Sequence, residues 1–154
     1  MSKTDIEIIN DIKHEIDKRD YKLIILVGSQ IENSSLIKKL EKLEWLKTIN
    51  LNYHLSKLLH DVQKNELSNP IDLIEKLPLE SKSTIFFNYN NILFDSNLEW
   101  DPLQIFKKLS RNYSIVAFWD GYKDNHTLKY AQNGHNEFKV FPLSDLQDVF
   151  ILNL

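Results

Sequence analysis

The stretch KLIILVG at residues 22–28 decides the fold, because its apolar side chains follow one another without alternation up to a glycine. An unbroken apolar run of this length is typical of a strand that is buried on both faces of a parallel sheet. Two further runs of the same kind are STIFFNY at 83–89 and NYSIVAFW at 112–119, and segments with helical spacing separate the three. Apolar strands that alternate with helices indicate an α/β protein with helices on both faces of its sheet.

Around these runs the sequence predicts one domain over residues 1–154, with three layers and a mostly parallel five-stranded sheet. Residues 1–19 are expected to contain an N-terminal amphipathic helix, for which Thr4 and Glu7 supply a capping box. The strands are expected at residues 22–27, 48–52, 83–88, 113–118 and 149–153.

Two helices carry boundary signals of their own. Leucines and isoleucines at helical spacing predict a helix over residues 34–46, which Ser34 or Ser35 is expected to cap. Asp101 before Pro102 predicts the start of another helix, because Asp is a preferred cap and Pro suits the first helical position.

A β-hairpin is expected near residues 127–141. The dipeptide Asn133-Gly134 favours a two-residue type I′ turn, in which both central residues need a positive φ. With that turn, Leu128 is expected to face Lys139 across the two strands. Successive side chains of such a unit point to opposite faces, so one face can pack inward while the other meets a partner.

Composition excludes several kinds of site. The 154 residues contain no Cys, so disulfides, zinc–thiolate sites, iron–sulfur clusters and thiol catalysis are excluded, and the five scattered His predict no metal site. A net charge of −3 argues against a broad nucleic-acid-binding surface and leaves a local patch open. The N-terminal residues lack a signal-peptide core and no stretch reaches ~18 apolar residues, so the protein is expected in the cytoplasm, away from membranes.

The residues after the first apolar strand form the first candidate site. A phosphate-binding loop between a strand and a helix has the pattern G-x-x-x-x-G-K-[ST], in which backbone N–H groups cradle phosphates and Lys supplies positive charge. Gly28 and Ser35 match the first and last positions, whereas Asn33 and Ser34 replace the second Gly and the Lys. Because Asn tolerates the left-handed conformation, the loop is expected to keep its shape and to lack its cation.

The end of the strand at 83–88 is the second candidate site. In nucleotide-hydrolysing proteins of this class, an acid here holds Mg²⁺. This chain has Asn88 instead, and the next acid, Asp95, lies seven residues further on. Both sites lack their charge while the apolar framework around them remains. The sequence therefore predicts no ATP hydrolysis and no bound cofactor, with ATP and Mg²⁺ as the alternative ligands.

Three motifs along the chain resemble one known family. They are INLNYHLSKLL at 49–59, the segment from D-P-L at 101–103 through L-S-R-N to W-x-G at 119–121, and the hairpin L-x-Y-A-x-x-G-H-x-E-F at 128–138. Over roughly residues 20–150 the chain resembles BrxF, the small P-loop-type protein of type III BREX phage-defence gene clusters. The resemblance implies a P-loop-NTPase-like sheet, in which the strand after the acidic site lies between that site's strand and the first strand.

The resemblance also implies which residues correspond to the family's nucleotide-binding positions. Gly28 and Ser35 match the family's nucleotide loop, whereas Asn33, Ser34 and Asn88 depart from it. For function, the resemblance implies membership of a host-defence assembly. The partners that it implies are a large ATPase, a PglZ-type protein, an adenine-specific DNA methyltransferase and a helicase.

Three residues are candidates for partner contacts. Arg111, one of two Arg in a Lys-rich chain, suits a partner carboxylate or phosphate, although a helix end also favours cations. Tyr130 and His135 lie in the predicted hairpin. The leading hypothesis is a non-catalytic accessory subunit that acts through protein contacts. Two alternatives stay open: an ATP-binding subunit that a partner completes, and an accessory module that contacts DNA.

Overall fold

The computed structural model describes residues 3–18, 22–61, 69–80, 82–130 and 139–154. Its helices are α1 (Asp5–Lys18), α2 (Ser34–Glu41), α3 (Leu51–His60), α4 (Pro70–Ile74) and α5 (Pro102–Leu109), with the short 3-10 helices η2 (Asn91–Phe94) and η3 (Leu143–Leu146). Its strands are β1 (Leu23–Gly28), β2 (Leu46–Asn50), β3 (Thr84–Asn88), β4 (Ser114–Lys123), β5 (Thr127–Tyr130), β6 (Lys139–Pro142) and β7 (Phe150–Asn153).

Five of these strands form a parallel sheet in the order β2-β3-β4-β1-β7. The predicted α/β class with a mostly parallel sheet is thereby confirmed. β4 lies between β1 and β3, which is the order that the resemblance implies. This architecture is compatible with a Rossmann-like or a P-loop-like fold.

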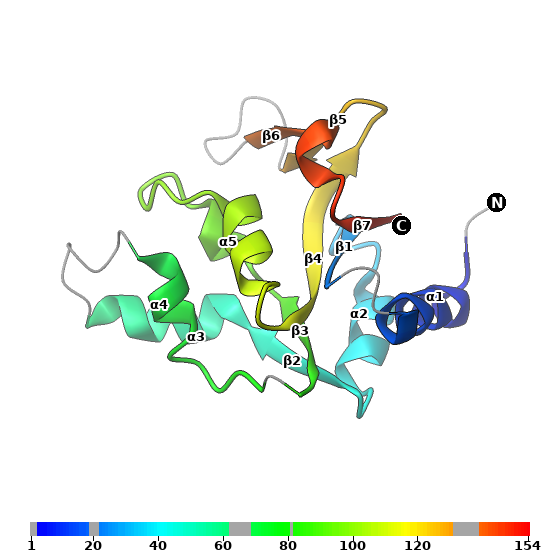
Figure 1. Ribbon diagram of the computed structural model, residues 1–154, viewed down its shortest axis with the longest axis horizontal. Coiled ribbons are helices and arrows are strands. Elements are labelled where there is room, and N and C mark those ends of the chain that lie inside the picture. Colours follow the sequence, from blue (N-terminus) through cyan, green and yellow to red (C-terminus); the bar gives the residue numbers. More distant parts are fainter. Residues whose placement is uncertain (1–2, 19–21, 62–68, 81, 131–138) are drawn as a thin grey trace.

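Helices cover both faces of the sheet (Figure 1). On one face, Ile12 of α1 and Leu40 of α2 belong to the cluster that contains Ile24. On the other face, Phe106 of α5 belongs to the cluster that contains Ile25, together with residues of α3 and α4. The neighbouring residues Ile24 and Ile25 thus lie in opposite clusters, which explains why β1 is apolar at every position.

Two of the predicted helix starts are confirmed. In the capping box of α1, the N–H of Glu7 donates to the hydroxyl of Thr4 at 3.2 Å, and the N–H of Thr4 donates to the carboxylate of Glu7 at 2.8 Å. At α5, the carboxylate of Asp101 accepts the N–H of Gln104 at 3.2 Å. Each cap satisfies donors that the first turn of a helix leaves without a helical partner.

The helix predicted over residues 34–46 is shorter, and neither predicted serine caps it. The helix ends at Glu41. Leu46, which the prediction placed on the buried face of this helix, belongs to β2 instead, where it is buried and pairs with Thr84. The N-cap is Asn33, whose side chain makes no capping bond. Periodicity alone could not separate the last leucine of a helix from the first residue of a strand.

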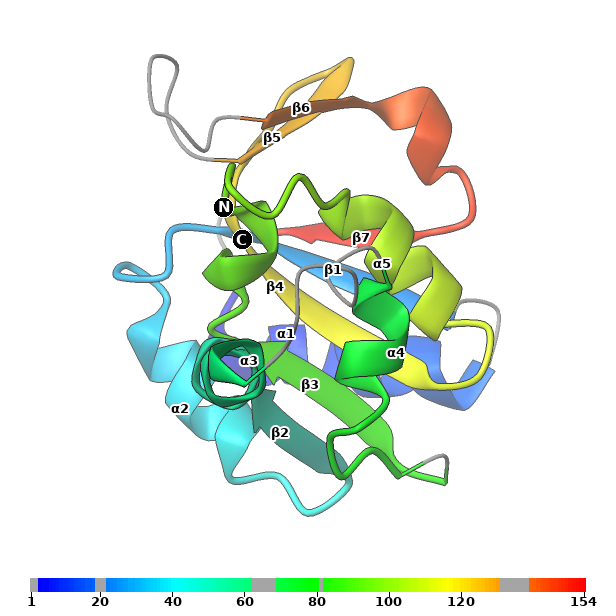
Figure 2. The same cartoon turned by 90° about the vertical axis from the view of Figure 1, so that its left-hand side faces the viewer.

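β4 does not end at residue 118 as predicted, but continues through Gly121 to Lys123 and pairs with β5 (Figure 2). Glycine is needed because a Cβ at residue 121 would lie 2.0 Å from the backbone carbonyl oxygen of Lys129. The same carbonyl accepts the indole N–H of Trp119 at 3.0 Å. Gly121 therefore permits a close approach of two strands, and the chain does not turn there.

The predicted pairing of the hairpin strands is wrong by two residues. Leu128 lies opposite Phe141, and not opposite Lys139. This pairing places the apolar side chains of Leu128 and Phe141 opposite each other on the face of the hairpin that packs against the core. There the ring centroids of Phe141 and Trp119 lie 5.4 Å apart. The dipeptide at 133–134, from which the register was predicted, lies outside the described residues.

The turn between β4 and β5 is organised by Asp124. One oxygen of its carboxylate accepts the N–H groups of His126 and Thr127, at 2.8 and 2.7 Å. The hydroxyl of Thr127 and the ammonium of Lys129 lie 3.0 and 3.2 Å from the same carboxylate. These donors, the N–H of His126 first, hold the pKa of Asp124 well below its usual range.

The stabilising effect of this turn is expected to depend on pH. Because the folded pKa of Asp124 is lowered, its contribution to stability is present above its unfolded pKa of about 3.9 and is lost as the pH falls below that value. Urea unfolding of the wild type and of Asp124→Asn between pH 3 and pH 7 measures this. The difference between the two proteins should be largest near pH 7 and shrink in acid. A constant difference would contradict the assignment.

Candidate functional site

The candidate site lies at the carboxyl edge of the parallel sheet, where ligands of open α/β sheets usually bind. Strand register brings the ends of β1, β2 and β3 together there beside Asp120 of β4. Gly28 of β1 pairs with Asp120 of β4, and Asn50 of β2 pairs with Asn88 of β3. The two candidate sites, at Gly28 and Asn88, are thus separated by one strand.

The loop after β1 is closed by hydrogen bonds within the chain. The N–H of Gln30 donates to the carboxylate of Asp120 at 3.1 Å. The N–H groups of Glu32 and Asn33 donate to the hydroxyl and the carbonyl of Ser29, at 3.3 and 3.0 Å. The N–H of Ser34 donates to the carbonyl of Ile31 at 3.4 Å. These N–H groups are therefore not directed at a ligand, as the amides of a phosphate-binding loop must be.

The expectation that Asn33 preserves the shape of the loop is wrong. Its φ is −105°, outside the left-handed region. Its side-chain amide donates to the carbonyl of Ser29 at 2.8 Å, and a Cβ at Gly28 would lie 2.8 Å from the same amide nitrogen. Asn33 thus packs over Gly28 and folds the loop onto itself.

A carboxylate stands beside the first turn of α2. The hydroxyl of Ser35 donates to Asp5 of α1 at 3.2 Å, and the ammonium of Lys39 pairs with the same oxygen at 2.9 Å. The N-terminus of a helix favours a negative charge, and in this protein α1 supplies one. Ser34 is exposed and brings no charge. Asp5 and Asp120 together make the surroundings of this loop unfavourable for a triphosphate.

The second candidate site, at Asn88, is also occupied by polar groups of the chain itself. Asn88 is 0 % exposed, and its amide nitrogen donates to the carboxylate of Glu41 at 2.6 Å. Its amide oxygen accepts the N–H of Tyr89 at 2.9 Å. Both the nitrogen and the oxygen of the Asn88 amide therefore have hydrogen-bond partners within the chain, and the acceptor of the nitrogen is the carboxylate of Glu41.

Further asparagines fasten the loops at this edge, and the sequence analysis missed them. The amide of Asn90 donates to the carbonyl of Phe118 at 2.8 Å. The amide of Asn91 donates to the hydroxyl of Tyr130 at 2.6 Å, and that of Asn52 reaches Asn91 at 3.4 Å. The sequence signal was the density of Asn after the second and third strands, which marks positions where loops need side-chain hydrogen bonds.

The predicted partner residues do not come together. Arg111 is exposed and precedes β4, at the edge of the sheet opposite to Gly28. Tyr130 is only 3 % exposed, with its ring stacked on Phe94 at 3.6 Å, so it is a core residue and the predicted surface role is wrong. His135 lies outside the described residues.

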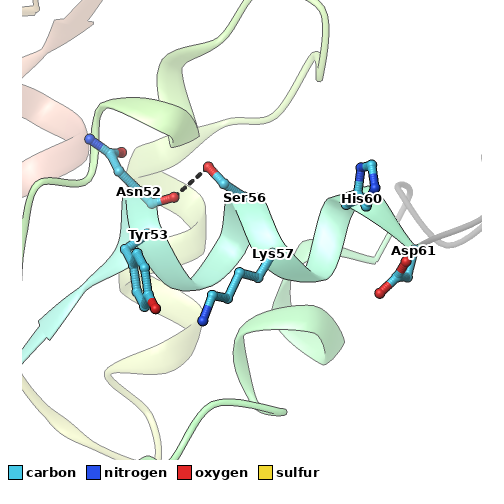
Figure 3. A pocket seen from close by; sticks show the side chains of 6 residues that line it. All are labelled: Asn52, Tyr53, Ser56, Lys57, His60 and Asp61. Carbon is cyan, nitrogen blue, oxygen red and sulfur yellow. Dashed lines mark hydrogen bonds between the residues drawn. The ribbon is translucent and has the colours of Figure 1, made fainter.

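An open hollow of about 790 Å³ lies over α3 (Figure 3). The Lys57 ammonium lies 4.3 Å from the ring centroid of Tyr53 and already covers that ring. The described lining residues are Asn52, Tyr53, Ser56, Lys57, His60 and Asp61. All of them belong to α3 or to its C-cap, and Gly28, Ser34, Ser35 and Asn88 are not among them.

ATP with Mg²⁺ is expected to bind more weakly than millimolar, because the loop has no cation and its amides already have acceptors. Asn33→Gly with Ser34→Lys should not restore binding, since Asp120 still occupies the amide of Gln30. Adding Asp120→Asn to that pair should give the first measurable affinity. Isothermal titration calorimetry of the three proteins tests this, and a micromolar dissociation constant for the wild type would contradict it.

Within the described residues, no three His, Asp or Glu side chains are placed to hold a metal ion together. No described helix combines the length and the apolar character that crossing a membrane requires. Comparison of the chain with known protein families, with curated proteins and with solved structures finds no match.

Proposed function

We propose that this protein is an accessory subunit of a BREX-like antiphage defence system, with a P-loop-derived fold, and that it acts through protein contacts without hydrolysing a nucleotide. The defence system and its partners come from the resemblance to BrxF. The partners proposed are the large ATPase, the PglZ-type protein and the DNA methyltransferase. Any contact with DNA is indirect in this proposal.

One observation carries the non-catalytic part of the proposal: both sites that nucleotide hydrolysis needs are occupied by the chain's own polar groups. Asp120 accepts a loop amide where a phosphate would be bound. Glu41 accepts from Asn88 where an acid would hold Mg²⁺. Phosphoryl transfer depends on positioned cations and metal ions, whereas Ser34 supplies no positive charge and Asn88 supplies no acid to hold a metal ion.

The strand order supports the P-loop-derived part of the proposal. β4 is inserted between β1, which leads into the candidate loop, and β3, which ends at Asn88. That order agrees with the one that the resemblance implies. The protein would then have kept the sheet of a nucleotide-binding ancestor while its loops became structural.

Co-expression with proteins encoded beside its gene tests the proposal. A tagged chain is expected to co-purify with the large ATPase, the PglZ-type protein or the methyltransferase, and Ser35→Ala should leave the yield of complex unchanged. Phage plaque counts in cells that carry the same variant should also match those of the wild type. ATPase activity of the isolated chain that Ser35→Ala abolishes would overturn the non-catalytic assignment, and failure to co-purify with all three proteins would overturn the partners.

A further inference from the structure

β6 has a free edge within the part of the chain that the structure describes. It pairs with β5 and with no other strand there. The N–H of Asp124 donates to the carbonyl of Thr127 at 3.0 Å, so these two residues form a hydrogen-bonded pair of the β4–β5 ladder. Hydrogen-bonded pairs alternate along antiparallel strands. Thr127 and Lys129 therefore direct their backbone polar groups at β4, and Leu128 and Tyr130 direct theirs at β6.

The same alternation fixes the direction of the groups on β6. Lys139 and Phe141, opposite Tyr130 and Leu128, face β5. The N–H and C=O of Val140 consequently point away from β5, and no described group is bonded to either. The side chain of Val140 is 45 % exposed. A strand edge with an unpaired N–H and C=O is a template for another strand.

A slot of about 340 Å³ runs along this edge. Three consecutive residues of β6 and three consecutive residues at the start of α5 line it, namely Lys139, Val140, Phe141, Trp100, Asp101 and Pro102. Consecutive residues of a strand line one hollow when the hollow lies beside the strand's edge, because their side chains point to opposite faces. The ammonium of Lys139 donates to the carbonyl of Trp100 at 2.8 Å and ties the two walls together.

Trp100 and Asp101 also line a second hollow of about 260 Å³. This hollow reaches α4 and the exposed face of α5, and its lining includes Ile71, Ile105 and Lys108. An extended chain that entered beside Val140 could therefore continue over the first turns of α5.

We propose that β6 binds one extended peptide segment of a protein partner by strand addition, with hydrogen bonds to Val140. The proposal rests on the proposed role in protein contacts and names the surface that would serve it. Residues 100–102, which line the slot opposite β6, favour a single extended segment as the occupant. Edge-to-edge pairing of two copies would bring a second sheet against residues 100–102, whereas one strand adds only about 4.8 Å of width. Val140 is exposed at this edge and favours an apolar side chain on the bound segment, whereas Trp100 and Pro102 are buried in the wall of the slot.

Linear 12-residue peptides displayed on phage are the probe. Peptides that bind the full chain are enriched, and the tightest one is synthesised and titrated by calorimetry. Val140→Pro removes the outward N–H without touching the β5 ladder, and it should weaken binding by about 10-fold or more. Val140→Ala keeps that N–H and is the matched control, with binding expected to fall by less than about 3-fold.

N-methylation of the peptide tests the same point on the wild-type protein. Methyl groups on one set of alternate residues should abolish binding, and methyl groups on the other set should leave it intact. Equal effects at all positions, or enrichment of no peptide, would overturn the proposal. Concentration-dependent dimerisation that Val140→Pro abolishes would replace the peptide with a second copy. If the defence partners co-purify equally well with Val140→Pro, the β6 slot is wrong while the proposed function stands.

Discussion

Gly121→Ala is expected to lower the free energy of unfolding by about 3–5 kcal/mol. The new Cβ would lie 2.0 Å from the carbonyl oxygen of Lys129, and that atom belongs to the backbone of β5. The strands must separate to relieve the overlap, which also displaces the acceptor of the Trp119 indole. Urea unfolding monitored by tryptophan fluorescence measures the change, because Trp119 is buried at this junction.

Gly28→Ala is the matched control for Gly121→Ala. Its Cβ would meet the side-chain nitrogen of Asn33 at 2.8 Å and the Cβ of Leu154 at 3.1 Å. Because Asn33 can rotate away, the expected loss is about 1–2 kcal/mol, well below that of Gly121→Ala. Equal losses for the two variants would show that β4 and β5 can separate at little cost, and would contradict the close approach as the reason for Gly121.

Asn88→Asp, which would supply the acid expected at the end of β3, should instead destabilise the protein by about 3 kcal/mol at pH 7. The amide of Asn88 donates to Glu41 at 2.6 Å, and a carboxylate there would meet another carboxylate. The site is also closed to solvent, which disfavours the charged form of an added acid. Thermal and urea unfolding of the variant measure the loss.

The pH dependence and a double substitution identify the cause. Burial and the neighbouring acid would raise the folded pKa of the added carboxyl, so the penalty should be absent below its unfolded pKa of about 3.9 and grow as the pH rises above it. Glu41→Gln in the Asn88→Asp background should recover about half of the loss or more, because the paired charge is removed. A penalty that is the same at pH 4 and pH 7, or that Glu41→Gln leaves unchanged, would rule out carboxylate repulsion.

The parallel sheet was predictable because its strands carry their own signal. Residues 23–27 and 85–87 are apolar at each position, and only a strand that is covered on both faces needs this pattern. The capping box of α1 and the Asp cap of α5 were predictable for a similar reason, since both involve residues within three positions of one another. Local patterns thus identified the parallel strands and the two candidate sites, although α2 ends earlier than predicted and β2 (Leu46–Asn50) begins before the predicted residue 48.

The contacts that close the candidate sites were not predictable, because they join residues that are distant in sequence. Asp120 is 90 residues from Gln30, Glu41 is 47 from Asn88, and Asp5 is 30 from Ser35. The absence of the Lys and of the acid was visible in the sequence. That Asp120 and Glu41 lie at the two sites instead of a phosphate and Mg²⁺ depends on the strand order. The hairpin register was predicted from the turn dipeptide alone, whereas the observed register brings Leu128 opposite Phe141 on the inner face of the hairpin.

The position of β4 between β1 and β3 has a consequence for synthesis on the ribosome. β1 ends at Gly28 and β4 begins at Ser114, so 86 residues must be added before β1 can acquire this neighbour. At translation rates of about 5–20 residues per second, that delay is on the order of 4 to 17 s. For this period the nascent chain carries an unpaired, fully apolar strand, which is the kind of segment that chaperones bind and that aggregates when they are scarce.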